Sequence, residues 1–122
     1  MATPKPGRRV RGSEHGRPIM ALLDLLGRRW ALRVGWELRF GPLRFRELQR
    51  RCAMVSPNLL TTRLREAVEA GITEKDAEGA YGLTPRGKSL VDLLDPMHQW
   101  AEDWAEEFRA PRPARKAPWP RR

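Results

Sequence analysis

Cysteine, histidine and long apolar segments are scarce in this 122-residue chain, and each shortage excludes a class of protein. The single cysteine cannot form an intrachain disulfide. With two isolated histidines, His15 and His98, a structural metal site is not expected. No apolar run approaches the roughly 18 residues that a membrane-spanning helix needs, so a membrane partner is not expected either. Because no glycine-rich phosphate loop, nucleophile elbow or Ser/His/Asp set is present, the sequence predicts neither an enzyme nor a cofactor.

An export signal is also missing. Arg8 and Arg9 precede a short apolar stretch at residues 18–23, as in a twin-arginine signal, but Asp24 interrupts that stretch and no small-residue cleavage site follows. We therefore expect a cytoplasmic protein. A chain of this length has room for one domain with a modest core.

Arginine is abundant, and its distribution is uneven. Of the formal net charge of +9, residues 1–17 carry +4 and residues 110–122 carry +5, so the segment 18–109 is neutral in sum. Within that segment, residues 28–65 carry +8 and residues 66–109 carry −7. A polyanion such as DNA would be attracted to the first half and repelled by the second.

Both ends of the chain combine proline with basic residues, a composition typical of disorder. We expect a disordered basic arm at residues 1–17, a folded domain at residues 18–109, and a disordered Pro/Arg-rich tail at residues 110–122.

The segment from Val55 to Glu66 is the most informative in the chain. Ser56 is a favourable N-cap, and Pro57 suits the first helical position, where its missing N–H costs nothing. At about 100° per residue, the apolar side chains gather on one face of the predicted helix and the short polar or cationic ones on the other. The inner set is Leu60, Leu64, Ala67 and Val68, and the outer set is Asn58, Thr61, Thr62 and Arg65. The outer set suits a recognition helix in a DNA groove, and an ordinary amphipathic helix is the alternative.

The neighbouring segments predict a winged helix-turn-helix, a mainly α fold with a small β-hairpin wing. A short helix with Phe45, Leu48 and Cys52 on one face and a tight turn at residues 53–55 precede the Ser56 helix. We expect further helices at residues 19–26 and 30–40, and strands at residues 72–74 and 80–83. A last helix opens at Thr84-Pro85, and Pro96 should kink or split it.

Four segments resemble the HxlR-type transcriptional regulators, a branch of the MarR-like winged helix proteins. They are, in chain order, LDLLGRRW (23–30), FGPLRFREL (40–48), SPNLLTTRLRE (56–66) and YGLTPRG (81–87). The resemblance implies a homodimer in which the first and last helices pair across the two-fold axis. The interface would then include Leu22, Leu25, Leu94, Met97, Trp100 and Trp104.

Two departures from the family pattern matter for function. Many relatives have a cysteine immediately before the first helix and some use it as a sensor, whereas Arg17 stands here, so that mechanism is not carried over. The predicted wing is short and its tip holds Asp76 and Glu78, which would repel phosphate.

On this interpretation the protein is a sequence-specific regulator in the nucleoid that binds a pseudo-palindromic operator on double-stranded DNA. Asn58, Thr61 and Thr62 would read bases. The predicted phosphate contacts are Arg44, Arg46, Ser56, Arg63 and Arg65. Basic arms would enter the minor groove in place of the wing, through Arg8, Arg9, Arg11, Arg112 and Arg115.

Several alternatives stay open. The protein could coat DNA without sequence preference, or the fold could serve as a protein-interaction module. Cys52 is predicted to be a small buried hydrophobe, with a thiolate stabilised by Arg50 and Arg51 as the alternative. A small-molecule effector, in a pocket near Trp30 or Trp36, also stays open.

Overall fold

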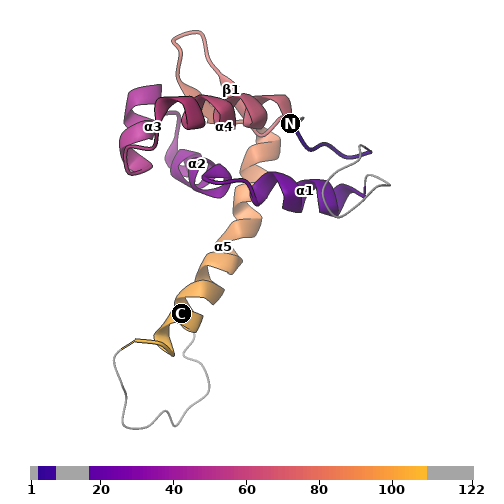
Figure 1. Ribbon diagram of the computed structural model, residues 1–122, viewed down its shortest axis with the longest axis vertical. Helices are drawn as coiled ribbons and strands as arrows, with labels where there is room; N and C mark the ends of the chain where they lie inside the picture. Colours follow the sequence, from indigo (N-terminus) through magenta and orange to yellow (C-terminus); the bar gives the residue numbers. More distant parts are fainter. Residues whose placement is uncertain (1–2, 8–16, 110–122) are drawn as a thin grey trace.

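The computed structural model describes residues 3–7 and 17–109, and it places one β-hairpin among α-helices. The mainly α class with a small hairpin is therefore confirmed. The elements are α1 (Pro18–Leu26), α2 (Ala31–Glu37), the 3-10 helix η1 (Leu38–Phe40), α3 (Phe45–Arg51), α4 (Pro57–Glu69), β1 (Thr73–Lys75), β2 (Tyr81–Leu83) and α5 (Pro85–Glu106). Figure 1 shows α1 to α4 gathered at one end of the molecule, with α5 extending away from them.

The two predicted helix caps are both present. The Ser56 side-chain oxygen accepts a hydrogen bond from the Leu59 N–H at 3.1 Å, and Pro57 occupies the first helical position. The Thr84 side-chain oxygen accepts from the Gly87 N–H at 2.9 Å, and its hydroxyl donates to the Gly71 carbonyl at 2.6 Å. Each cap satisfies a backbone donor that the first turn of its helix would otherwise leave unpaired.

One predicted helix and the two predicted strands differ in detail from the observed elements. The predicted helix 30–40 is α2 followed by η1, because Trp30 adopts a left-handed conformation at the helix start (φ 73°) and the last turn tightens before Gly41. The strands are shifted by about one residue and pair antiparallel, with Thr73 opposite Leu83.

The predicted split at Pro96 was wrong. The helix α5 is continuous from Pro85 to Glu106, and it appears in Figure 1 as one uninterrupted ribbon. Proline has a helical φ and lacks one N–H donor, so α5 gives up a single backbone hydrogen bond at Pro96 and continues through it.

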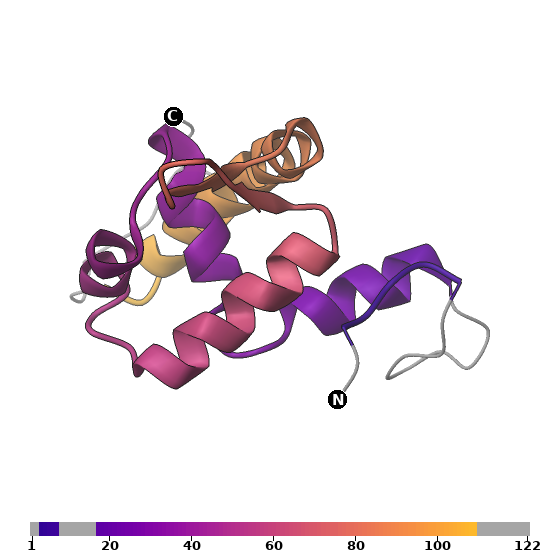
Figure 2. The same ribbon diagram turned by 90° about the horizontal axis from the view of Figure 1, so that it is seen from above.

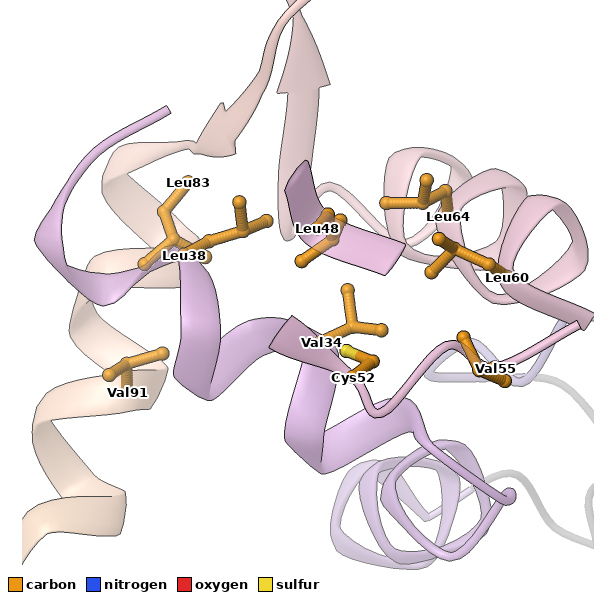
Figure 3. Packing of buried hydrophobic residues seen from close by; sticks show 9 residues of the cluster. All are labelled: Val34, Leu38, Leu48, Cys52, Val55, Leu60, Leu64, Leu83 and Val91. Carbon is orange, nitrogen blue, oxygen red and sulfur yellow. The ribbon is translucent and has the colours of Figure 1, made fainter. Parts of the chain in front are cut away.

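The core lies between α2, α3, α4 and the start of α5, and Figure 3 shows its side chains converging. Its buried members are Val34, Leu38, Leu48, Cys52, Val55, Leu60, Leu64, Leu83 and Val91. Cys52 is fully buried, as predicted, and this burial raises the pKa of its thiol, although Arg33 acts in the opposite direction. The alternative of a thiolate stabilised by its arginine neighbours was therefore wrong.

Residues 3–7 have a defined place in the structure, which differs from the disorder expected for the arm. Thr3 is buried, and its hydroxyl donates to a Glu69 carboxylate oxygen at 2.6 Å. Pro4 and Pro6 line an apolar groove together with Leu22 of α1. Figure 2 shows this segment running alongside α1. Prolines lose little conformational entropy on packing, which favours such a contact.

Candidate nucleic-acid interface

The helices α3 and α4 are joined by a tight turn that fixes their relative orientation. Ala53 and Met54 both adopt left-handed conformations, with φ of 57° and 58°. The Gln49 side-chain amide donates to the Val55 carbonyl at 2.9 Å, and the Met54 N–H donates to the Gln49 carbonyl at 2.9 Å. Val55 is buried beneath the turn. These contacts hold two helices in the arrangement that the helix-turn-helix prediction requires.

The helix α4 has the two predicted faces over its first turns, but Val68, which was predicted for the inner face, is 42% exposed. Leu60 and Leu64 are fully buried, whereas Asn58 and Thr61 are exposed in the first turns. Thr62 is half-buried, and its hydroxyl donates to the Asn58 carbonyl at 3.0 Å. Because that hydroxyl is used within the helix, the methyl group is the part of Thr62 best suited to contact a base.

The predicted phosphate contacts divide into two groups. Arg44, Arg46 and Arg65 are exposed, and Arg65 donates weakly to Glu69 at 3.4 Å. Ser56 is exposed at the start of α4, but its side-chain oxygen is used by the cap. The exposed arginines can therefore reach a phosphate without losing a buried partner.

Arg63 belongs to the second group, because its side chain faces the protein. Its Nε donates to the Arg29 carbonyl at 2.6 Å, and its Nη1 donates to Glu66 at 2.9 Å. Only 14% of its side chain is exposed. The structure thus places Arg63 away from the exposed cations, in a buried ion-pair cluster that the sequence pattern did not reveal.

The hairpin between β1 and β2 contains the acidic tip. Asp76 has a structural role there, since its carboxylate accepts hydrogen bonds from the Glu78 and Ala80 N–H groups, both at 2.9 Å. Such an Asx-type turn explains an acid at this position without any contact to a ligand. Glu78 is exposed, so the tip keeps its negative charge.

The residues predicted for a dimer interface differ in exposure. In this single chain Leu25 is buried, and Leu22 and Leu94 are half-buried. The others lie on an exposed apolar stripe, which comprises Leu93, Met97, Trp100 and Trp104 of α5 and Phe108 just after its end. The rings of Trp100 and Trp104 stack at 5.6 Å between centroids, and Phe108 meets Trp104 edge-on at 5.7 Å.

A family model described as "HxlR-like helix-turn-helix" matches residues 25–109 of this chain. The chain belongs to this family. The match covers the helix-turn-helix, the hairpin and all of α5, so the HxlR resemblance of the four sequence segments is confirmed.

Named relatives agree with this assignment. The HTH-type transcriptional regulator YodB of Bacillus subtilis is 32% identical over 89 residues, which are 68% of this chain and 80% of YodB. The structure of quinone-bound YodB superposes with a TM-score of 0.64 and covers 69% of this chain and 93% of that one. A MarR-family regulator of Enterococcus faecalis is 30% identical, with a TM-score of 0.65, and covers 74% of this chain and 87% of that one.

The HxlR-like family consists of transcriptional regulators rather than enzymes, so this chain is a transcriptional regulator of the helix-turn-helix type with a winged-helix fold. In residues 3–7 and 17–109, no helix is long and apolar enough to cross a membrane. Across the same residues, no three His, Cys, Asp or Glu side chains group as metal ligands would. The predicted minor-groove arms, Arg8, Arg9, Arg11, Arg112 and Arg115, lie outside the described residues.

Proposed function

We propose that this HxlR-like regulator binds a pseudo-palindromic operator as a homodimer, with α4 of each subunit in the major groove. The observation that carries the proposal is the division of α4 into an apolar face, on which Leu60 and Leu64 are fully buried, and an exposed polar face. The exposed face begins at a capped helix start with Asn58 and Thr61, which are side chains that can reach base edges.

Within this interface, base reading and phosphate binding fall to different side chains. Asn58, Thr61 and the methyl group of Thr62 would contact bases, since Asn pairs well with adenine and a methyl group can touch thymine. Arg44, Arg46 and Arg65 would bind phosphates and set the register. We leave Arg63 out of the phosphate set because leaving its present position would break two hydrogen bonds.

The homodimer is supported by the apolar stripe of α5. A monomer in water rarely exposes a row of large apolar side chains of this length. Trp100 and Trp104 are each at least half exposed, and tryptophan side chains of this kind are common at protein interfaces. A second copy of α5 and α1 would cover the stripe, as the family resemblance implies. Leu22, Leu25 and Leu94 would then support the interface from beneath rather than form its centre.

The basic ends of the chain would add phosphate contacts that the acidic hairpin tip does not offer. Deleting residues 1–17 and 110–122 together should weaken DNA binding and reduce its salt dependence, because fewer counterions are released. A salt dependence equal to that of the full chain would show that the ends do not contact DNA.

We do not propose that an effector regulates this protein by reacting with a thiol. YodB has been crystallised with bound quinone, but the one cysteine of this chain, Cys52, is fully buried in the core. Buried thiols with a raised pKa are poor nucleophiles. We expect that quinones and diamide leave DNA binding by this protein unchanged, as measured by operator affinity before and after treatment.

Selection of bound sequences from a random duplex library, at near-physiological salt, tests the proposal. A two-fold symmetric motif with half-sites about one helical turn apart is expected. Binding without any enriched motif would favour a protein that coats DNA. An absence of binding even at low salt would favour a protein-interaction module.

Two substitutions test the assignment of base reading and phosphate binding to different side chains. Thr62→Ala should change the preferred sequence, with a loss of about 1–3 kcal/mol at one base pair. Arg46→Ala should weaken operator and random DNA alike and lower the salt slope by about 1. Equal losses on both DNAs for both variants would contradict the assignment.

A further inference from the structure

A cluster of four nearly buried charges joins the α1 end of the molecule to α4. The Glu66 carboxylate accepts a hydrogen bond from Arg28 Nη1 at 2.5 Å and another from Arg63 Nη1 at 2.9 Å. Asp24 lies 3.8 Å from the other end of the Arg28 guanidinium. Two positive and two negative side chains, each at most 14% exposed, therefore balance one another.

The cluster connects segments that are distant in sequence. Asp24 belongs to α1, Arg28 and Arg29 form the turn after α1, and Glu66 is on α4, 38 residues beyond Arg28. The helix backbones of α1 and α4 make few close contacts, so these side chains provide a large part of the connection between them. Charged hydrogen bonds are short, directional and stronger when water is excluded, which makes this connection stiff.

The cluster also borders the candidate DNA-contacting side chains. A cleft of about 350 Å³ lies beside it, and its lining includes Thr62 and Arg65 as well as Arg28, Arg63 and Glu66. A change in the position of Glu66 would therefore move the outer face of α4 directly, through its own helix and through Arg63.

We propose that Glu66 is a positioning residue that couples α1 to the recognition helix and thereby sets the half-site spacing that the dimer accepts. The inference rests on the proposed function, in which α1 lies at the dimer interface and α4 in the major groove. In such a dimer the distance between the two recognition helices depends on how each α4 is oriented against its own α1. Glu66 is the buried side chain on which this orientation depends, because it binds Arg28 directly and also holds Arg63, which donates to the Arg29 carbonyl.

The test compares Glu66→Gln with Glu69→Gln in the full-length protein. Both substitutions remove one negative charge from α4, but Glu69 is 42% exposed, its pair with Arg65 is long at 3.4 Å, and its bond from the Thr3 hydroxyl can also be accepted by the Gln side-chain oxygen. The measured quantity is affinity for the selected operator, for the same operator with one base pair inserted or deleted between its half-sites, and for random duplex DNA. Circular dichroism confirms that each variant is folded.

We expect Glu66→Gln to reduce the discrimination between the correct and altered spacings by about tenfold, a loss of about 1.4 kcal/mol. Glu69→Gln should keep this discrimination within about twofold of the wild type. A purely structural role for Glu66 would instead lower thermal stability and leave the spacing preference unchanged. Glu66→Gln with the same spacing preference as Glu69→Gln therefore overturns the inference.

A second variant decides the question if Glu66→Gln does not fold. Arg28→Met removes the direct connection from Glu66 to Arg28 and Asp24, but it leaves Glu66 paired with Arg63 and Arg63 bonded to the Arg29 carbonyl, so no carboxylate on α4 loses its only partner. It should relax the spacing preference in the same way, and an unchanged preference would overturn the inference. A wild-type protein that selects no symmetric motif would overturn the proposed function itself, which is a result distinct from either variant.

Discussion

The helices α4 and α5 begin with the same sequence signal, but their apolar faces lie in opposite surroundings. Each opens with a Ser/Thr cap followed by proline, and each carries apolar residues at helical spacing. The apolar face of α4 is covered by its own chain, with Leu60 and Leu64 fully buried. On α5 only the first turns are covered, through Gly87 and Val91, and the stripe from Leu93 onward is exposed.

This difference separates two kinds of amphipathic helix. In α4 the free face is polar, so the informative side chains are those that face the solvent. In α5 the free face is apolar, so burial of the stripe requires a second chain. Periodicity finds both faces, but only the arrangement of the other elements decides which face the chain covers itself.

The largest expected effect is at the point where α5 joins the fold. A Cβ added to Gly87 would lie 2.0 Å from the Ile72 carbonyl oxygen, so backbone would have to move. Gly87→Ala should lower the free energy of unfolding by about 3 kcal/mol, measured by urea denaturation. Gly35→Ala is the matched control, because a Cβ there meets nothing within 4 Å. It should be neutral or stabilising by up to about 1 kcal/mol. Equal effects would show that α5 is loosely attached.

The next effect concerns the exposed stripe. Replacing Trp100 and Trp104 together by alanine should weaken the free energy of dimerisation by more than about 2 kcal/mol, since aromatic residues dominate most interfaces. The monomer should unfold almost as before, because both side chains lie outside its core. Sedimentation velocity over a range of concentrations measures this change. Phe40→Ala serves as the control, since Phe40 is 80% exposed but lies off the stripe. Unchanged dimerisation in the double variant would contradict the proposed interface.

The sequence predicted what depends on local geometry. The two caps, the buried face of α4 and the turn at residues 53–55 follow from side chains within a few residues of one another, and the structure has all three. The burial of Cys52 follows in the same way from its spacing to Phe45 and Leu48.

What the sequence did not predict depends on contacts between distant segments. Arg63 looked like a phosphate contact because its position on the helical wheel does not show that Arg29 and Glu66 capture its guanidinium. Glu66 looked like one more acid of the negative half, since its partner Arg28 lies 38 residues away. Pro96 predicted a split because it removes a helical hydrogen bond, yet α5 continues from Pro85 to Glu106 with this proline inside it.

The smallest expected effects are at the two helix caps, and measuring them compares the starts of α4 and α5. Ser56→Ala removes one hydrogen bond at the exposed start of α4 and should cost about 1 kcal/mol of unfolding free energy. Thr84→Ala removes the equivalent bond and also the bond to the Gly71 carbonyl, which connects α5 to the end of α4. It should cost roughly twice as much, because the Gly71 carbonyl loses this bond in addition to the Gly87 N–H. Chemical denaturation of both variants measures the difference, with Ser89→Ala, at an exposed position within α5, as the control. If Thr84→Ala costs no more than Ser56→Ala, the Thr84 side chain acts only as a cap, and its bond to the Gly71 carbonyl adds nothing measurable to the stability of the fold.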